Sequence, residues 1–249
     1  MAEQELKGRV AIVTGAGRNI GRAIALSLAA GGAAVVVNAR SNRAEAEAVA
    51  REIESGGGRA LAVLADVADP AAGEKIAAAA VERFGRIDYL VNNAAPRPET
   101  PLDQLTLAEW REVIGTILDG AFLCVKACLR ELKKSGAGAI INIGGMSAHT
   151  GAKDRVHVVT AKLGLVGFTR ALAHDLAADR VTVNCVVPGL ILTKRATAVE
   201  PKHHAIHHTL SGQRGSPEDV AASVRFLCGP GGRYITGQII HLNGGAYLG

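Results

Sequence analysis

Short apolar runs alternate with longer stretches of mixed apolar and polar residues along nearly the whole chain. Runs such as Val35-Val36-Val37 and Ala139-Ile140-Ile141 are continuously apolar, as in strands buried on both faces of a sheet. Alternation of this kind implies right-handed crossovers and a doubly wound parallel α/β sheet of about seven strands, with helices on both faces. The pattern predicts strands near residues 9–14, 33–39, 59–65, 87–92, 138–144, 180–187 and 236–242, and helices near 19–31, 42–56, 70–85, 106–134, 155–178 and 217–228.

The first predicted strand ends in a glycine-rich turn, Thr14-Gly15-Ala16-Gly17-Arg18-Asn19-Ile20-Gly21, which leads into an apolar helix. Glycines allow a tight bend and let backbone N–H groups approach a pyrophosphate, while the helix N-terminus favours negative charge. Such a turn can also be a plain packing device. Ligands of a sheet like this one bind outside the carboxyl ends of its strands, so we expect a phosphate site at this turn.

Length and composition predict a single domain over residues 1–249, since 249 residues of which 48% are apolar can bury a large core. The apolar stretch 23–37 is interrupted by Ser27, Gly31 and Gly32, and so predicts a helix and a strand rather than a membrane span. The first residues lack the pattern of a signal peptide, which favours a cytoplasmic protein with no membrane partner.

The net charge of +5 does not indicate a nucleic-acid partner, because basic residues are scattered and aromatic residues for base stacking are few. The four cysteines, at positions 124, 128, 185 and 228, form no CxxC pair. We expect them to be buried, small apolar residues.

Further motifs follow the later strands: Asp66-Val67, Asn92-Asn93-Ala94-Ala95, Lys162 on a helix, Pro188-Gly189 and Asn243-Gly244-Gly245. Together with the glycine-rich turn, these motifs resemble the short-chain dehydrogenase/reductase family, and the 3-oxoacyl-(acyl-carrier-protein) reductase-like branch most closely. The resemblance covers nearly the whole chain. It implies a Rossmann-type dinucleotide-binding fold, a substrate lid near 190–216, and a homo-oligomer, a tetramer or dimer, formed through the helices near 106–134 and 155–178.

Cofactor choice is partly visible at the end of the second strand, where the sequence is Asn38-Ala39-Arg40. A carboxylate there would hold a ribose 2′-OH, whereas an arginine accepts a 2′-phosphate. Arg18 adds a second cation, as in NADP-preferring family members, so we predict NADP(H) over NAD(H); the alternative is that both arginines are solvated surface charges. Asn19 replaces the middle glycine of the family pattern but tolerates turn geometry. The resemblance places Asp66 and Val67 beside the adenine, and Asn93, Ile191 and Thr193 beside the nicotinamide. The predicted cofactor-binding residues are Gly15, Arg18, Asn19, Ile20, Gly21, Arg40, Asp66, Val67, Asn93, Lys162, Pro188, Gly189, Ile191 and Thr193.

The catalytic positions depart from the family. Counted without gaps from Lys162, the family's active serine falls on Gly145, its tyrosine on Val158 and its helix asparagine on Ile117. In the family the tyrosine transfers the proton of the carbonyl oxygen, the lysine lowers the tyrosine pKa, the serine orients the oxygen and the asparagine supports a water relay. Valine can perform none of the proton chemistry.

Substitutes for the lost groups lie nearby in the sequence. Ser147 is two residues beyond Gly145 and could orient an oxygen. Histidine as a residue type titrates near neutrality, so His157 or His149 could replace tyrosine as proton donor. On a helix, however, His157 points about 100° away from Val158. The predicted catalytic residues are Lys162, Ser147 and His157.

The predicted lid is basic, with Lys194, Arg195, Lys202, His203, His204, His207 and His208. No cysteine or carboxylate accompanies these histidines at ligand spacing, so the segment favours anion attraction over a metal site. It suggests a small anionic substrate: a carboxylate, a phosphate or a thioester.

Two functions therefore remain open. The first is an NADP(H)-dependent oxidoreductase acting on a carbonyl or hydroxyl group, 3-oxoacyl-like, with a non-standard proton donor. The second is a non-redox or catalytically silent member of the fold that keeps the dinucleotide site. The retained cofactor motifs lead us to predict the oxidoreductase, although a retained fold is not a retained function.

Overall fold

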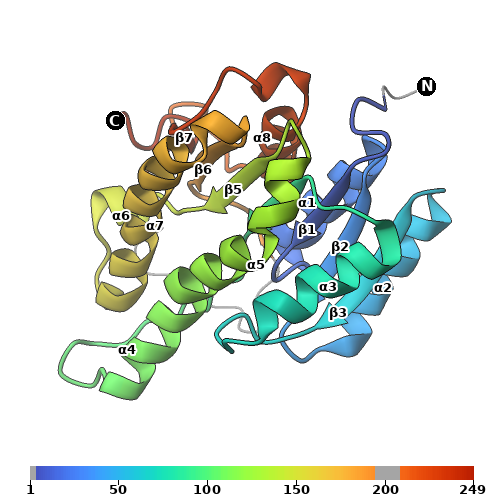
Figure 1. Cartoon of the computed structure of the whole chain (residues 1–249). Coiled ribbons are helices and arrows are strands. Elements are labelled where there is room, and N and C mark those ends of the chain that lie inside the picture. The colour runs from blue at the N-terminus through green and yellow to red at the C-terminus, as the bar shows by residue number, and fades with distance from the viewer. Residues whose placement is uncertain (1–3, 194–207) are drawn as a thin grey trace.

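The computed structural model describes residues 4–193 and 208–249, and its centre is one parallel sheet (Figure 1). The seven strands lie in the order β3-β2-β1-β4-β5-β6-β7, and every neighbouring pair is parallel. The predicted α/β class and strand positions are confirmed. The strands are β1 (Val10–Val13), β2 (Ala34–Ala39), β3 (Arg59–Leu64), β4 (Tyr89–Asn92), β5 (Ala139–Ile143), β6 (Thr182–Pro188) and β7 (Ile239–Leu242).

The helices also follow the predicted ranges, with two differences. The long helix expected near 106–134 is two α-helices joined by a π-helical segment, and a short helix, α6, precedes α7. The described helices are α1 (Asn19–Ala30), α2 (Arg43–Ser55), α3 (Ala72–Phe84), α4 (Leu107–Ile114), the π segment η1 (Gly115–Asp119), α5 (Gly120–Lys134), α6 (Ser147–Thr150), α7 (Val156–Asp175) and α8 (Pro217–Cys228), with 3₁₀ turns η2 (Ala177–Asp179) and η4 (Pro230–Gly232).

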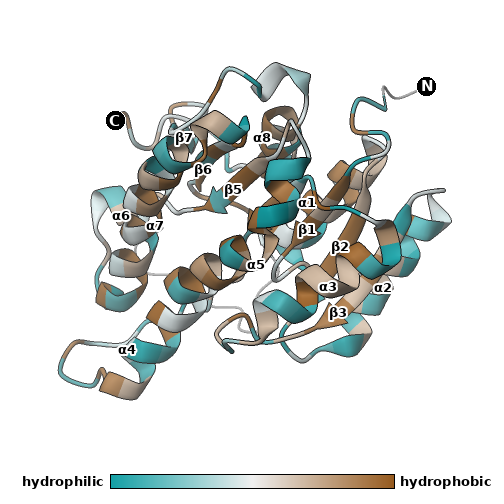
Figure 2. Ribbon diagram, in the orientation of Figure 1, coloured by the Kyte–Doolittle hydropathy of each residue, from teal (hydrophilic) through white to brown (hydrophobic). Residues whose placement is uncertain are grey.

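Each face of the sheet has its own hydrophobic core, which explains the continuous apolar runs. Along β2, Val35 and Val37 face the core under α1, α2 and α8, whereas Val36 faces the core under α3, α5 and α7. Figure 2 shows the apolar strands enclosed between helices that carry their polar residues outward. The four cysteines are buried, as expected.

Within residues 4–193 and 208–249, one helix, α7, is long and apolar enough by composition to cross a membrane. It nevertheless packs against β6 and α4 and buries Leu165, Val166 and Ala173 in the protein. The core helix of a soluble protein meets the same criterion of length and composition, so α7 is weak evidence for a membrane span.

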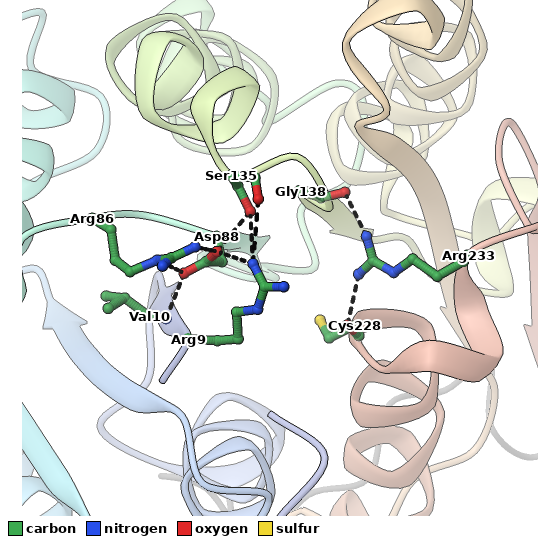
Figure 3. Close-up of polar contacts among 8 residues, drawn as sticks. All are labelled: Arg9, Val10, Arg86, Asp88, Ser135, Gly138, Cys228 and Arg233. Carbon is green, nitrogen blue, oxygen red and sulfur yellow. Dashed lines mark hydrogen bonds and ion pairs between the residues drawn. The ribbon is translucent and has the colours of Figure 1, made fainter. Parts of the chain in front are cut away.

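At the amino edge of the sheet, a fully buried carboxylate ties several elements together (Figure 3). Asp88 accepts hydrogen bonds from Arg9 Nη1 (2.8 Å), Arg86 Nε (2.8 Å) and Nη2 (2.7 Å), Ser135 Oγ (2.6 Å) and the Val10 amide (2.9 Å). Burial alone would raise the pKa of Asp88, but the hydrogen bonds from Arg86, Ser135 and Arg9 outweigh it and lower the pKa. These contacts join the start of β1 to the residues before β4 and after α5.

Candidate active site

A cleft of about 830 Å³ opens at the carboxyl edge of the sheet, opposite the Asp88 cluster. Its walls are the segments that follow β1, β2, β3, β4, β5 and β6, together with one face of α7. The structure brings nearly all the predicted cofactor residues to this cleft, but Thr193 is not among the residues that line it. The predicted residues on its walls are Gly15, Arg18, Asn19, Ile20, Gly21, Arg40, Asp66, Val67, Asn93, Lys162, Pro188, Gly189 and Ile191.

The glycine-rich turn is braced by Asn93 from the end of β4. The side-chain amide of Asn93 donates to the carbonyl oxygens of Thr14 (2.8 Å) and Gly15 (3.0 Å), and the Thr14 hydroxyl accepts from the Asn93 amide (3.0 Å). A Cβ at Gly21 would lie 2.3 Å from the Gly15 oxygen. Close backbone approach therefore requires glycine at position 21, and the turn is held rigid beside the cleft.

The start of α1 is suited to an anion. Asn19 has φ +50°, a left-handed conformation that asparagine adopts more readily than most residues. In this described segment Arg18 provides no side-chain cap, and the first turn contains no acidic residue. The N–H groups and the positive end of the helix dipole are thus available at the cleft.

The end of β2 presents Arg40 to the cleft, whereas Asn38 is used for structure. Asn38 donates to the carbonyl oxygens of Val63 (3.2 Å) and Ala65 (3.1 Å) and is almost fully buried. The Arg40 side chain is 61% exposed and lies 3.3 Å from a carboxylate oxygen of Glu112. Arg40 is therefore a long, exposed cationic side chain at the cleft edge, and its ion pair with Glu112 is a weak surface one.

The substrate end of the cleft has an apolar wall. Val158 lines the cleft at 2% exposure and packs in one hydrophobic cluster with Ile117, Ala161 and Leu165. Ile117 belongs to the π segment η1. The two positions that the resemblance assigns to tyrosine and asparagine thus hold side chains that contribute to a small apolar core. At Gly145, a Cβ would meet nothing within 4 Å.

Lys162 lies one turn of α7 beyond Val158 and lines the same wall at 5% exposure. Its Nζ donates a hydrogen bond to the carbonyl oxygen of Ile143, at the end of β5. Burial is the largest cause, and together with the positive charges of Arg97 and Arg155 it lowers the pKa of Lys162 to about 7, with Cys185 opposing in part. Lys162 is therefore a buried amine whose charged and neutral forms are both populated near neutral pH.

Arg97 and Arg155 also line the cleft, and the sequence did not single them out as site residues. Arg97 follows β4, and Arg155, which is 6% exposed, immediately precedes α7. The sequence signal that could have identified them is their position, because each lies in a segment that follows a strand at the carboxyl edge of the sheet. Ser147, predicted to orient an oxygen, is at the start of α6 and lines the cleft.

The structure does not bring the two candidate histidines to the cleft. His157 is fully buried, and its Nε2 lies 3.6 Å from Glu109 Oε1. Its helical rotation relative to Val158 turns it away from the cleft wall, as the 100° spacing implied. His149 packs against His241 and Tyr247, with ring centroids 4.6 Å and 5.7 Å away.

Most of the predicted lid lies outside the described residues. Lys194, Arg195, Lys202, His203, His204 and His207 all fall in 194–207, and only His208 is described, as an exposed residue.

Comparison with known proteins agrees with this geometry. A family model described as enoyl-(acyl carrier protein) reductase matches residues 15–247. A 3-oxoacyl-(acyl-carrier-protein) reductase of a Synechocystis species is 40% identical over 244 residues, which is 98% of each chain. A short-chain dehydrogenase of Burkholderia cenocepacia, solved in complex with NADP, is 36% identical, with a TM-score of 0.90 over 97% of this chain and 99% of its own. A blue fluorescent protein from a metagenomic library, solved with NADPH, is 36% identical, with a TM-score of 0.91 over 98% of this chain and all of its own.

Proposed function

The chain belongs to the short-chain dehydrogenase/reductase family, and on that premise we propose that it is an NADP(H)-dependent oxidoreductase that interconverts a carbonyl and a hydroxyl group. The observation that carries the proposal is the cofactor half of the cleft. The braced glycine turn, the uncapped start of α1 and the arginines at positions 18 and 40 lie along one continuous wall. These are the features that a dinucleotide pyrophosphate and a 2′-phosphate require.

The preference for NADP(H) is proposed from charge. The end of β2 has no carboxylate at Asn38, Ala39 or Arg40 to hold a ribose 2′-OH, and Arg40 and Arg18 both line the cleft. Two solved relatives at 36% identity hold NADP or NADPH, which supports the same choice.

The bound cofactor would supply or accept a hydride at the nicotinamide end of the cleft. The chain then has to bind the substrate, exclude water and move one proton at the substrate oxygen. Ser147, which lines the cleft, would orient that oxygen, and Val158 and its apolar neighbours would cover the reacting centre. Since valine holds no transferable proton, the proton donor must be another group of this chain or a water molecule.

We take the substrate to be a small 3-oxoacyl-like compound, anionic or carried as a thioester. The name of the 40% identical relative and the two arginines beside Lys162 support this class. Residues 190–216 would act as the lid of a single domain, and a cytoplasmic location stays a prediction.

A homo-oligomer through α5 and α7 is part of the same proposal. Phe122 on α5 is 51% exposed and Leu163 on α7 is 48% exposed. Apolar side chains of both helices, among them Val125 and Leu129, line a shallow groove between them. Light scattering of the full chain should give a dimer or tetramer, and Phe122→Asp should shift it toward monomer.

One specific observation favours the second function, a non-redox or silent member that keeps the dinucleotide site. The apolar cluster around Val158 and Ile117 replaces the proton relay with a packed core. This function predicts cofactor binding without turnover of any carbonyl compound, even when a tyrosine is restored at position 158.

The deciding experiment is a fluorescence titration of the full chain with NADPH and with NADH, followed by NADPH oxidation with an acetoacetyl thioester. We expect NADPH to bind at least about tenfold more tightly than NADH, and the thioester to be reduced. Equal affinity for NADPH and NADH would contradict the proposed preference for NADP(H). If neither cofactor binds, the proposed oxidoreductase function is wrong.

A matched pair of glycine variants controls that titration. Gly21→Ala puts a Cβ against the Gly15 carbonyl oxygen, whereas Gly167→Ala, on an open face of α7, meets nothing within 4 Å. Binding that survives in Gly21→Ala, with folding verified by circular dichroism, would not come from this cleft.

A further inference from the structure

We propose that Lys162 is itself the proton donor of this enzyme, delivering a proton from Nζ directly to the substrate carbonyl oxygen. The inference rests on the proposed oxidoreductase function. It assigns to the lysine a role different from the one that the resemblance implies, in which the lysine acts through a tyrosine.

Lys162 lines the cleft on the same helix face as Val158, the position of the missing hydroxyl. Lys162 follows Val158 by four residues on α7, so the two side chains lie on one helix face, and both line the cleft. An ammonium carries three protons. The hydrogen bond to Ile143 uses one of them and fixes the amine at the end of β5, leaving two for other acceptors.

The other described groups on this wall are poorer donors. Arg97 and Arg155 keep their protons at any working pH. A serine hydroxyl such as that of Ser147 is a weak acid. His157 and His149 do not line the cleft, and Asp66 follows β3, at the far end of the sheet from α7. Glu99 also lines the cleft, and the test below includes it as the competing donor.

The surroundings suit Lys162 to acid chemistry. Three charged or titratable groups face the amine: Arg155 from the start of α7, Arg97 from the segment after β4, and Cys185 from β6. Burial and the two arginines bring the pKa of Lys162 to about 7. A general acid works best when its pKa lies near the working pH, whereas an ordinary lysine holds its proton too tightly.

The step balances without a further reactant. The carbonyl carbon takes the hydride that the cofactor supplies, and the carbonyl oxygen takes a proton from Nζ. The products are an alcohol, the oxidised cofactor and the neutral amine of Lys162, which regains its proton from water. In the direction of alcohol oxidation, the neutral amine is the base.

The test measures single-turnover reduction of an acetoacetyl thioester by the enzyme already loaded with NADPH, from about pH 5.5 to about pH 9.5. The rate should fall as pH rises through about 7, because the ammonium is lost. In Lys162→Arg the cation remains but releases no proton, so the rate should drop about 10²–10⁴-fold and lose this pH dependence. NADPH affinity, titrated separately for each variant, separates a loss of donor from a loss of cofactor.

Two further variants keep the test decisive. Lys162→Arg combined with Val158→Tyr gives the site a new hydroxyl donor and should recover activity over Lys162→Arg alone. Glu99→Gln should leave the falling limb near pH 7 in place. Persistence of that limb in Lys162→Arg, or its disappearance in Glu99→Gln, would overturn the assignment of Lys162.

A direct titration covers the case in which the thioester is not turned over. The amine signal of Lys162, identified by NMR as the lysine resonance absent from Lys162→Arg, should titrate near pH 7; a midpoint above about 9 overturns the proposal. If Val158→Tyr reduces the thioester and the parent does not, Lys162 is not the proton donor, but the proposed oxidoreductase function still holds. Failure of every variant to bind NADPH defeats the proposed function itself.

Discussion

Two buried ionisable groups lie at opposite edges of the same sheet, and they meet opposite surroundings. Asp88, at the amino edge, is fully buried among Arg9, Arg86 and Ser135 (Figure 3). Lys162, at the carboxyl edge, is 5% exposed and faces two more cations. Both pKa values are lowered. A lowered pKa means that the fold favours the charged carboxylate of Asp88 but the neutral amine of Lys162.

The difference separates a structural charge from a functional one. At the amino edge each carboxylate oxygen of Asp88 is matched by donors, so the cluster holds strands and a helix end together. At the carboxyl edge the chain keeps an amine whose charge the fold destabilises. A pKa shifted in this way is typical of catalytic and ligand-binding sites, because a buried charge that destabilises the fold gives no benefit to folding.

The largest effect should come from adding a hydroxyl donor beside Lys162 at the carboxyl edge. Val158 lines the cleft and Gly145 has open space for a side chain, so Val158→Tyr with Gly145→Ser can project hydroxyls into the substrate end. We expect carbonyl reduction to rise by about 10²-fold or more over the parent, measured as NADPH oxidation.

Gly145→Ser alone is the control and should change the rate little, because it adds no acid. Failure of the double variant to exceed the parent would indicate that the pocket has been rebuilt for other chemistry.

The next effect concerns the amino edge. Asp88→Asn keeps the shape of the side chain but removes the charge that Arg9 and Arg86 share. The free energy of unfolding in urea should fall by about 3 kcal/mol, since the amide nitrogen of the buried asparagine cannot accept the hydrogen bonds that one carboxylate oxygen of Asp88 accepts. The folded-state pKa of Asp88 is below 3.8, so its contribution is present above about pH 4 and is lost as the pH falls through the folded-state pKa.

Asp179→Asn serves as the matched control. Asp179 pairs with Lys133 at 2.8 Å, but both side chains are about a third exposed. Its loss should lower the free energy of unfolding by no more than about 1 kcal/mol. Equal effects of the two substitutions would contradict a structural role particular to Asp88.

The third prediction has the opposite sign. Lys162→Met should raise the free energy of unfolding by about 3 kcal/mol near pH 6, because the buried ammonium is replaced by an apolar side chain of similar length. The parent's penalty is complete below pH 7, the approximate folded-state pKa, and is relieved as pH rises toward the unfolded value of 10.5.

The gain from Lys162→Met should therefore shrink between about pH 7 and about pH 10. Lys75→Met on the exposed face of α3 should change stability by less than about 0.5 kcal/mol at every pH. A gain for Lys162→Met that does not vary with pH would point to packing instead of charge.

The sequence predicted the fold well because buried parallel strands leave a plain signature. Val35, Val36 and Val37 are apolar in succession since both faces of β2 are covered. The π segment Gly115–Asp119 was missed because a change in helical hydrogen bonding hardly alters the hydropathy pattern.

The candidate site was predictable where backbone geometry selects the residue. Gly15 and Gly21 are readable from sequence because a left-handed φ or a close approach needs glycine. Arg97 and Arg155 were not, because their approach to Lys162 depends on the course of irregular segments. One residue of helical rotation separates Val158, which lines the cleft, from His157, which does not, as the spacing of about 100° per residue indicated.

The smallest effect tests the cofactor end of the cleft, where charge is exposed. Arg40→Ala should weaken NADPH binding about tenfold, or about 1.4 kcal/mol, and leave NADH binding unchanged, because only NADPH carries the 2′-phosphate. The difference should diminish at high salt, as expected for a cation that is 61% exposed. Arg43→Ala is the matched control, since Arg43 pairs with Glu47 along α2 and does not line the cleft. Equal losses in the two variants would mean that net charge attracts NADPH and that Arg40 makes no particular contact. A loss confined to Arg40→Ala would show that Arg40 binds the 2′-phosphate directly. The cofactor end of the cleft would then resemble the Asp88 cluster in one respect, because in both places a charge is paired with a group of opposite charge.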